Sequence, residues 1–214
     1  MKLVDLFNFS NFEHKAIFKQ SRNLWEPVLD LDNYLEKTFK NNAETKLIGS
    51  GTSIDPAAKI IGSVIIGRNC EIKEGVLIRE GVIIGDNCVI GHACEVKHSV
   101  IMDGTHIAHF NYVGDSVLGN RVNMAAGAII ANYKHGAKNE IVHIEEGKVK
   151  IPTGLKKFGS LIGDEARIGC NAVLDPGTII GKRTIIYPLA AVRGNIPANK
   201  IVKYRQNFEV VDRK

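Results

Sequence analysis

Residues 54–96 read IDPAAKIIGSVIIGRNCEIKEGVLIREGVIIGDNCVIGHACEV, and an aliphatic side chain returns at every sixth position of this stretch. The spacing continues beyond it with a five-residue step before 101 and before 118, and it resumes at 162 after a break. All of these positions are Ile, Val, Leu or Met: 54, 60, 66, 72, 78, 84, 90, 96, 101, 107, 113, 118, 124, 130, 162, 168, 174, 180, 186 and 192. A fixed period of this kind indicates an internal repeat.

The residue four places after each aliphatic position is also small. Leaving aside the repeat at 130, where the insertion begins, it is Ala, Val, Cys or Thr in every repeat from Ala58 onward except at Asn111 and Ile196. The two positions would point inward with one outward residue between them, which is the alternation of a β-strand. The residue after the aliphatic position is often Gly or Asp, which suits a corner. Six residues per side and three sides per coil predict an all-β parallel β-helix of about seven coils.

The repeat also divides the chain. Residues 1–46 carry a helical pattern and are expected to form a cap over the first coil. Residues 47–196 form the β-helix, interrupted by an insertion at 131–161 that we expect to be functional or to form its own hairpin. Residues 197–214 form a basic tail. The apolar face of the predicted cap helix carries Val28, Leu31, Leu35 and Phe39.

Composition and charge narrow the function. The 214 residues carry a formal net charge of +5, and the positive charge gathers in 131–161 and 193–214. Two local basic clusters fit small phosphorylated ligands better than nucleic acid, unless they are only solvated loops and tail. No stretch approaches the roughly 18 apolar residues of a membrane span, and we expect no signal peptide. Four cysteines without a CxxC pair predict reduced thiols and a cytoplasmic protein.

Counting 18 residues per coil places the cations Arg79 and Lys97 close together. Arg79 and Lys97 follow aliphatic positions that are 18 residues apart, so they should stack one coil from each other. Asn132 lies on the same edge, two coils further on. Like charges about 5 Å apart repel unless an anion bridges them. The pair therefore suggests a phosphate site, and the alternative is that both side chains extend into water.

His109 lies on the neighbouring edge of the predicted column, at the other end of the face that carries an outward Tyr112. A histidine with an ordinary pKa near 6.5 can accept a proton at neutral pH. The alternative is an ordinary surface histidine. His92 occupies the equivalent position one coil earlier, but two histidines without a third ligand make a weak zinc site. We therefore predict no metal.

The remaining histidines and the cysteines have simpler explanations. Cys70, Cys88 and Cys94 fall at the small inward position, where a free cysteine behaves as a small hydrophobe. Cys170 falls at a corner and is expected to be exposed. The other histidines have no chemical context and are interpreted as surface residues: His14, His98, His106, His135 and His143.

A more specific pattern is centred on residues 95–133, EVKHSVIMDGTHIAHFNYVGDSVLGNRVNMAAGAIIANY, and extends to one residue on either side of them. The residues that carry it are Arg79 in LIREG, Glu95, Lys97, His109, Tyr112, Gly114, Asp115, Asn123, Asn132, Tyr133 and then Lys138. In order and spacing they resemble the acetyltransferase domain of the bifunctional N-acetylglucosamine-1-phosphate uridyltransferase/glucosamine-1-phosphate acetyltransferase, a hexapeptide-repeat acyltransferase. Residues 24–40 look like the helical linker before the prism in two-domain sugar nucleotidyltransferases.

The resemblance implies a left-handed β-helix, a homotrimer with sites between subunits, and acetyl-CoA as co-substrate. The acceptor would be an amino-sugar phosphate such as glucosamine-1-phosphate, in UDP-N-acetylglucosamine biosynthesis. By resemblance, His109 is the catalytic base. The phosphate would be held by Arg79, Lys97 and Lys138, and the sugar by Tyr112, Asn123, Asn132 and Tyr133. Acetyl-CoA would lie along the later coils and the basic tail, near Cys170, Lys203 and Arg205.

The first 46 residues are too few for a nucleotide-binding sheet, so we expect no uridyltransferase activity from this chain alone. Two other hypotheses therefore stay open. One is another hexapeptide enzyme, with a different acyl acceptor or a zinc-dependent hydratase activity. The other is a non-catalytic trimeric module that partners a separate sugar nucleotidyltransferase.

Overall fold

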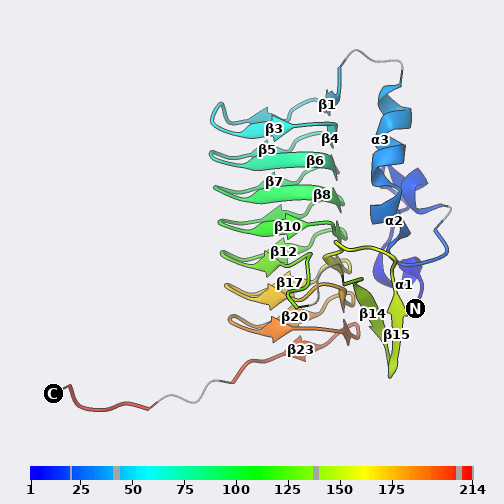
Figure 1. Ribbon diagram of the computed structural model, residues 1–214. Helices are drawn as coiled ribbons and strands as arrows, with labels where there is room; N and C mark the ends of the chain where they lie inside the picture. Colours follow the sequence, from blue (N-terminus) through cyan, green and yellow to red (C-terminus); the bar gives the residue numbers. More distant parts are fainter. Residues whose placement is uncertain (20, 41–43, 137–139, 206–208, 214) are drawn as a thin grey trace.

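Short parallel strands stack into a column with three faces in the computed structural model, which describes residues 1–19, 21–40, 44–136, 140–205 and 209–213 (Figure 1). The first face is an 8-stranded sheet with one strand per coil. In order along the column it contains β2 (Ser53–Ile54), β5 (Glu71–Ile72), β7 (Val89–Ile90), β9 (His106–Ile107), β12 (Asn123–Met124), β17 (Arg167–Ile168), β20 (Ile185–Ile186) and β23 (Ile201–Val202).

The second and third faces form one 13-stranded sheet, because β6 (Leu77–Ile84) and β8 (Glu95–Ile101) run through the corner between them. The second face consists of the first halves of β6 and β8 together with five more strands. These are β3 (Lys59–Ile61), β10 (Tyr112–Gly114), β13 (Ile129–Ile130), β18 (Val173–Leu174) and β21 (Ala191–Val192). The third face consists of the second halves of β6 and β8 together with six more strands. These are β1 (Lys46–Ile48), β4 (Val64–Ile66), β11 (Val117–Leu118), β16 (Ser160–Ile162), β19 (Thr178–Ile180) and β22 (Asn195–Ile196).

The strand register follows the arithmetic of the repeat. Ile72 pairs with Ile90, 18 residues later, in the regular coils. Val96 pairs with Val113 across the first five-residue step, so that coil is one residue shorter. Leu118 pairs with Ile162 across the insertion. The parallel β-helix predicted from the sequence is therefore confirmed, with like residues placed over like residues from coil to coil. The first face has eight strands where about seven coils were predicted, because β23 in the predicted tail adds one.

The interior is the aliphatic ladder that the repeat predicted. Ile78, Ile84 and Ile90 are fully buried, and so are Val82 and Val96 of the same cluster. The three inward cysteines are buried too, whereas Cys170 is exposed, as expected. Few aromatic rings are needed, because aliphatic side chains at the spacing of paired strands already fill the prism.

The N-terminal helices lie along the third face and do not cover the first coil, so the predicted cap was wrong in position (Figure 1). They are α1 (Leu3–Leu6), the 3-10 helix η1 (Lys15–Phe18), α2 (Glu26–Leu29) and α3 (Leu31–Phe39). The physical reason lies in the outward positions of the third face, which are apolar. Ile65, Ile83 and Val100 form a second core with Leu31, Leu35 and other helical residues.

The insertion and the tail also take defined positions. An antiparallel hairpin, β14 (His143–Glu146) and β15 (Val149–Pro152), occupies the predicted insertion at 131–161. Within the predicted tail 197–214, β23 pairs with β20, so the column extends to Val202. Within the described ranges, no helix combines the length and apolar character needed to cross a membrane.

Replacing Ile84 by Asp is expected to prevent folding, because the carboxylate would stand unpaired inside the ladder, at a cost of several kcal/mol. Circular dichroism and the yield of soluble protein measure this. Ile61→Asp is the matched control, since Ile61 is 45% exposed at the open end of the same column. A folded Ile84→Asp variant with unchanged melting temperature would contradict the sealed interior.

Candidate functional site

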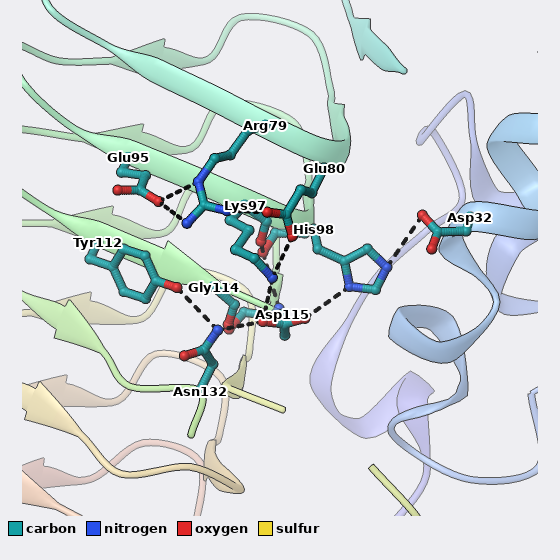
Figure 2. A network of polar contacts seen from close by, with 12 residues as sticks. Asp32, Arg79, Glu80, Glu95, Lys97, His98, Tyr112, Gly114, Asp115 and Asn132 are labelled. Atoms are coloured by element: carbon teal, nitrogen blue, oxygen red, sulfur yellow. Dashed lines mark hydrogen bonds and ion pairs between the residues drawn. The ribbon is translucent and has the colours of Figure 1, made fainter. Parts of the chain in front are cut away.

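The corner between the second and third faces carries a connected network of charged residues. In the strand register Arg79 lies beside Lys97, and Lys97 lies beside Gly114. Residues of three successive coils therefore meet at this corner. The corner residues Glu80, His98 and Asp115 have positive φ angles of 59°, 44° and 48°. This left-handed backbone turns the strand sharply, and the side chains converge as Figure 2 shows. The stacking of Arg79 on Lys97 expected from the sequence is confirmed.

Each cation in the corner has carboxylate partners. The Arg79 guanidinium donates to Glu95 Oε1, with Nε–O and Nη2–O distances of 2.8 and 2.7 Å, and it also pairs with Glu80. The Lys97 ammonium lies 2.9 Å from Glu80 Oε2 and 3.4 Å from Asp115 Oδ2. The bridging anion that the stacked charges require is therefore the side chain of Glu80.

Lys97 is an unusual lysine because its side chain is only 7% exposed. Burial disfavours its charged form, but the carboxylates of Glu80 and Asp115 outweigh that penalty, and the pKa of Lys97 is raised. The ammonium is thus held as a cation between two carboxylates. It acts as a fixed positive charge.

Asp115 organises the rest of the corner. Its carboxylate accepts hydrogen bonds from Lys97, from Asn132 Nδ2, and from His98 Nδ1 at 3.0 Å. Burial raises the pKa of Asp115, but the hydrogen bonds from His98 and Asn132 and the charge of Lys97 prevail, so this pKa is lowered. Asn132 also donates to the Tyr112 hydroxyl at 3.0 Å.

His98 differs from what the sequence suggested, because it is not a plain surface residue. Its side chain is 18% exposed, and it connects Asp115 through Nδ1 with Asp32 on α3, 3.5 Å from Nε2. The sequence offered no signal for this contact, since Asp32 is remote in the chain and the packing of α3 on the third face brings it near. His98 therefore ties the helices to the corner.

A cavity of about 560 Å³ opens beside this corner, between α3 and the column. Its lining includes Glu80, Lys97, His98 and Asp115, together with Asp32 from the helix. Four other cavities on the described residues are smaller, at about 80 to 350 Å³. The polar network of the corner thus faces open volume.

His109 and Tyr112 take the positions expected of them. His109 follows β9 at the corner between the first and second faces, is exposed, and makes no side-chain hydrogen bond with any described residue. Tyr112 begins β10 on the second face, which leads from that corner to Asp115. Burial raises the pKa of the Tyr112 hydroxyl. The second face therefore connects His109 with the corner of Arg79 and Lys97.

Other predicted residues lie apart from this network. Asn123 sits on β12 of the first face, between His106 and Arg167. Tyr133 is exposed and meets the ring of His135 edge-on, with centroids 6.2 Å apart. Lys138 lies outside the described residues. Within one chain the structure thus joins Arg79, Lys97, Tyr112 and Asn132, and it leaves Asn123 on another face.

The residues predicted to contact acetyl-CoA lie along the edge that carries His109. Cys170 follows β17 by two residues, as His109 follows β9, and both are exposed. Lys203 directly follows β23, and its ammonium lies 5.7 Å from the centroid of the Tyr187 ring. Arg205 is exposed beyond it. No group of three or more potential metal ligands occurs among the described residues.

Several curated proteins are similar to this chain in sequence. The chain is 34% identical over 231 aligned positions to the bifunctional sugar-1-phosphate nucleotidylyltransferase/acetyltransferase of Sulfurisphaera tokodaii, covering 98% of this chain and 55% of that protein. It is 31% identical over 110 residues to the bifunctional protein GlmU of Methanococcus aeolicus, covering 51% of this chain and 26% of that protein. The chain thus spans about half, or less, of the length of these curated relatives.

A family described as the GMPPB C-terminal domain matches residues 60–152. Among solved structures, an Arabidopsis UDP-N-acetylglucosamine acyltransferase aligns with 73% of this chain and 60% of its own, at 15% identity and a TM-score of 0.48. The fold and the repeat define a hexapeptide-repeat β-helix protein. It resembles the acetyltransferase part of the bifunctional sugar-1-phosphate nucleotidylyltransferase/acetyltransferases, as its motifs predicted.

Replacing Asp115 by Asn is expected to lower the free energy of unfolding at pH 7 by about 3 kcal/mol, because Lys97 and His98 lose a buried anionic partner. The pKa of Asp115 is lowered in the folded protein. Its contribution is therefore complete above the unfolded pKa of about 3.9 and disappears as the pH falls through the lower folded value. Urea titrations of both proteins should give a difference at pH 7 that shrinks below about pH 4.

Asp212→Asn serves as the control, since Asp212 is exposed near the C-terminus. It should match the wild type at every pH. An Asp115→Asn variant as stable as the wild type at pH 7, or a difference that persists undiminished at pH 2, would show that Asp115 is not a stabilising anion.

Proposed function

We propose that this protein is an acetyl-CoA-dependent N-acetyltransferase that acts on an amino-sugar phosphate of the glucosamine-1-phosphate type. The observation that carries the proposal is the second face of the column. It presents Arg79 and Lys97 at one edge, Tyr112 and Asn132 beside them, and His109 at the other edge. The names of the relatives, which include acetyltransferase and sugar-1-phosphate, support the same reaction.

The face supplies the needs of acyl transfer to an amine. Arg79 and Lys97 bind the phosphate, and Tyr112 and Asn132 hydrogen-bond the sugar hydroxyls. The sugar ammonium first releases one proton to solvent, and the neutral amine attacks the thioester carbonyl. His109 accepts the proton that the nitrogen loses as the carbon–nitrogen bond forms. The carbon–sulfur bond then breaks, and the CoA thiolate takes that proton from His109 and leaves as the thiol. The exposure of His109 suits a base that must reach a bound substrate.

Acetyl-CoA is proposed to lie along the edge that carries His109, Cys170 and Lys203. These residues follow β9, β17 and β23, so one extended molecule along that edge passes all of them. The exposed Arg205 would add positive charge for the phosphates of CoA. The thioester would thus reach the same end of the second face as the proposed base.

We further propose a cytoplasmic homotrimer in which a neighbouring subunit completes the site. Asn123 supports this, because it faces outward on β12 of the first face, away from Tyr112 and Asn132 of its own chain. Tyr133 and Lys138 would act from the insertion, in their own site or a neighbour's. A separate sugar nucleotidyltransferase is the proposed partner, since N-acetylation yields a sugar phosphate that can accept a nucleotidyl group from a nucleoside triphosphate.

The first test is thiol release from acetyl-CoA by the purified protein, with and without glucosamine-1-phosphate. Release that depends on the sugar phosphate supports the proposal. Absence of release with this and other amino-sugar phosphates contradicts it and favours the non-catalytic module. In that case, copurification of a nucleotidyltransferase becomes the next observation to seek.

His109→Ala should abolish turnover, a loss of about 10²–10⁴-fold, because the proton acceptor is removed. The melting temperature and the oligomeric state should not change, since the His109 side chain is exposed and makes no hydrogen bond with described residues. Both are measured by circular dichroism and light scattering.

His106→Ala is the matched control, because His106 is also exposed and lies on the strand just before. It should keep full activity. Equal activity in the two variants would mean that His109 is not the base.

A further inference from the structure

Glu80 occupies the place where the stacked cations predict a phosphate. Its two carboxylate oxygens bind different cations, Oε1 pairing with Arg79 and Oε2 lying 2.9 Å from the Lys97 ammonium (Figure 2). A phosphate uses its oxygens on two neighbouring cations in the same way. The arrangement is therefore a ligand-like contact made by the chain itself.

The contact is built so that it can be broken. The Glu80 side chain is 55% exposed, and its ion pairs in the described structure are with these two cations only. It stands on a corner where the register shifts between Arg79 and Val82, followed by Gly81 with a φ of 78°. No packed core holds the carboxylate in place, so it can rotate into solvent without unfolding the column.

Both cations would stay in position after Glu80 leaves. Arg79 keeps its hydrogen bond and its ion pair with Glu95, and Lys97 keeps its ion pair with the buried Asp115. Each cation then has one carboxylate partner left, Glu95 for Arg79 and Asp115 for Lys97. Both can contact an anion that takes the position of the Glu80 carboxylate. The cavity of about 560 Å³, which Glu80 and Lys97 both line, provides room for an incoming group.

We propose that Glu80 is a built-in competitor for the substrate's phosphate group, and that it sets specificity for a phosphorylated sugar. A dianionic phosphate displaces the carboxylate, because it brings more charge and more acceptor oxygens to Arg79 and Lys97. A neutral sugar cannot displace it. The sugar part of this inference rests on the proposed function, whereas the displacement of Glu80 by phosphate does not.

The test uses inorganic phosphate at a pH near 8, where the anion is mostly doubly charged, with binding followed by calorimetry at low ionic strength. Glu80→Gln keeps the size of the side chain and removes its charge. We expect it to bind phosphate about tenfold more tightly than the wild type, as one competing charge at close range would predict. Glu80→Ala provides a second variant should the glutamine variant fail to fold.

Glu71→Gln is the matched control. Glu71 is half-exposed on the same column and pairs with Lys73, so its removal changes the net charge equally away from Arg79. It should bind phosphate as the wild type does. Adding Arg79→Met to Glu80→Gln should remove the gain. Equal affinity in all proteins, undetectable phosphate binding in all of them, or a gain that survives Arg79→Met overturns the inference.

Turnover separates this inference from the proposed function. With glucosamine-1-phosphate, Glu80→Gln should lower KM while glucosamine without phosphate is affected little. If no variant releases CoA but Glu80→Gln still binds phosphate more tightly, the proposed function fails and the role of Glu80 stands. If the wild type turns over and Glu80→Gln changes neither phosphate affinity nor KM, the role of Glu80 fails alone.

Discussion

The structure depends on one constraint, which is that every coil must place its backbone hydrogen-bonding groups opposite those of the next, about 4.8 Å away. Parallel pairing in register makes residue over residue the rule, as in Ile72 over Ile90. An aliphatic interior tolerates this repetition, because like side chains pack well on each other. Insertions are accepted only where the chain returns to the same register, as it does from Leu118 to Ile162.

The same constraint gives the corner its chemistry. Register forces Arg79 onto Lys97, and water cannot screen two cations that are partly buried. Carboxylates on adjacent coils must therefore supply the compensation, and Asp115 does so from the next coil. A charged network is thus a consequence of stacking, and a site that binds an external anion can be built by leaving one of the compensating groups exposed.

The N-terminal helices also influence the geometry of the corner. Their apolar face covers the third face, so one side of the column is occupied by the protein's own chain. The helices do not pack on the second face, which carries Tyr112. The contact of His98 with both Asp115 and Asp32 links these two sides, so the packing of α3 and the geometry of the corner depend on each other.

The sequence by itself determined the coil, the interior positions and the stacking of Arg79 on Lys97, because a six-residue period is a local property that register preserves over any length. It also indicated which face carries Tyr112, between His109 and Asp115. Only the tertiary structure decided that Glu80 bridges the two cations, that His98 is enclosed, and that the helices lie on the third face. These features depend on the direction of corner side chains and on contacts between remote segments, which no repeat encodes.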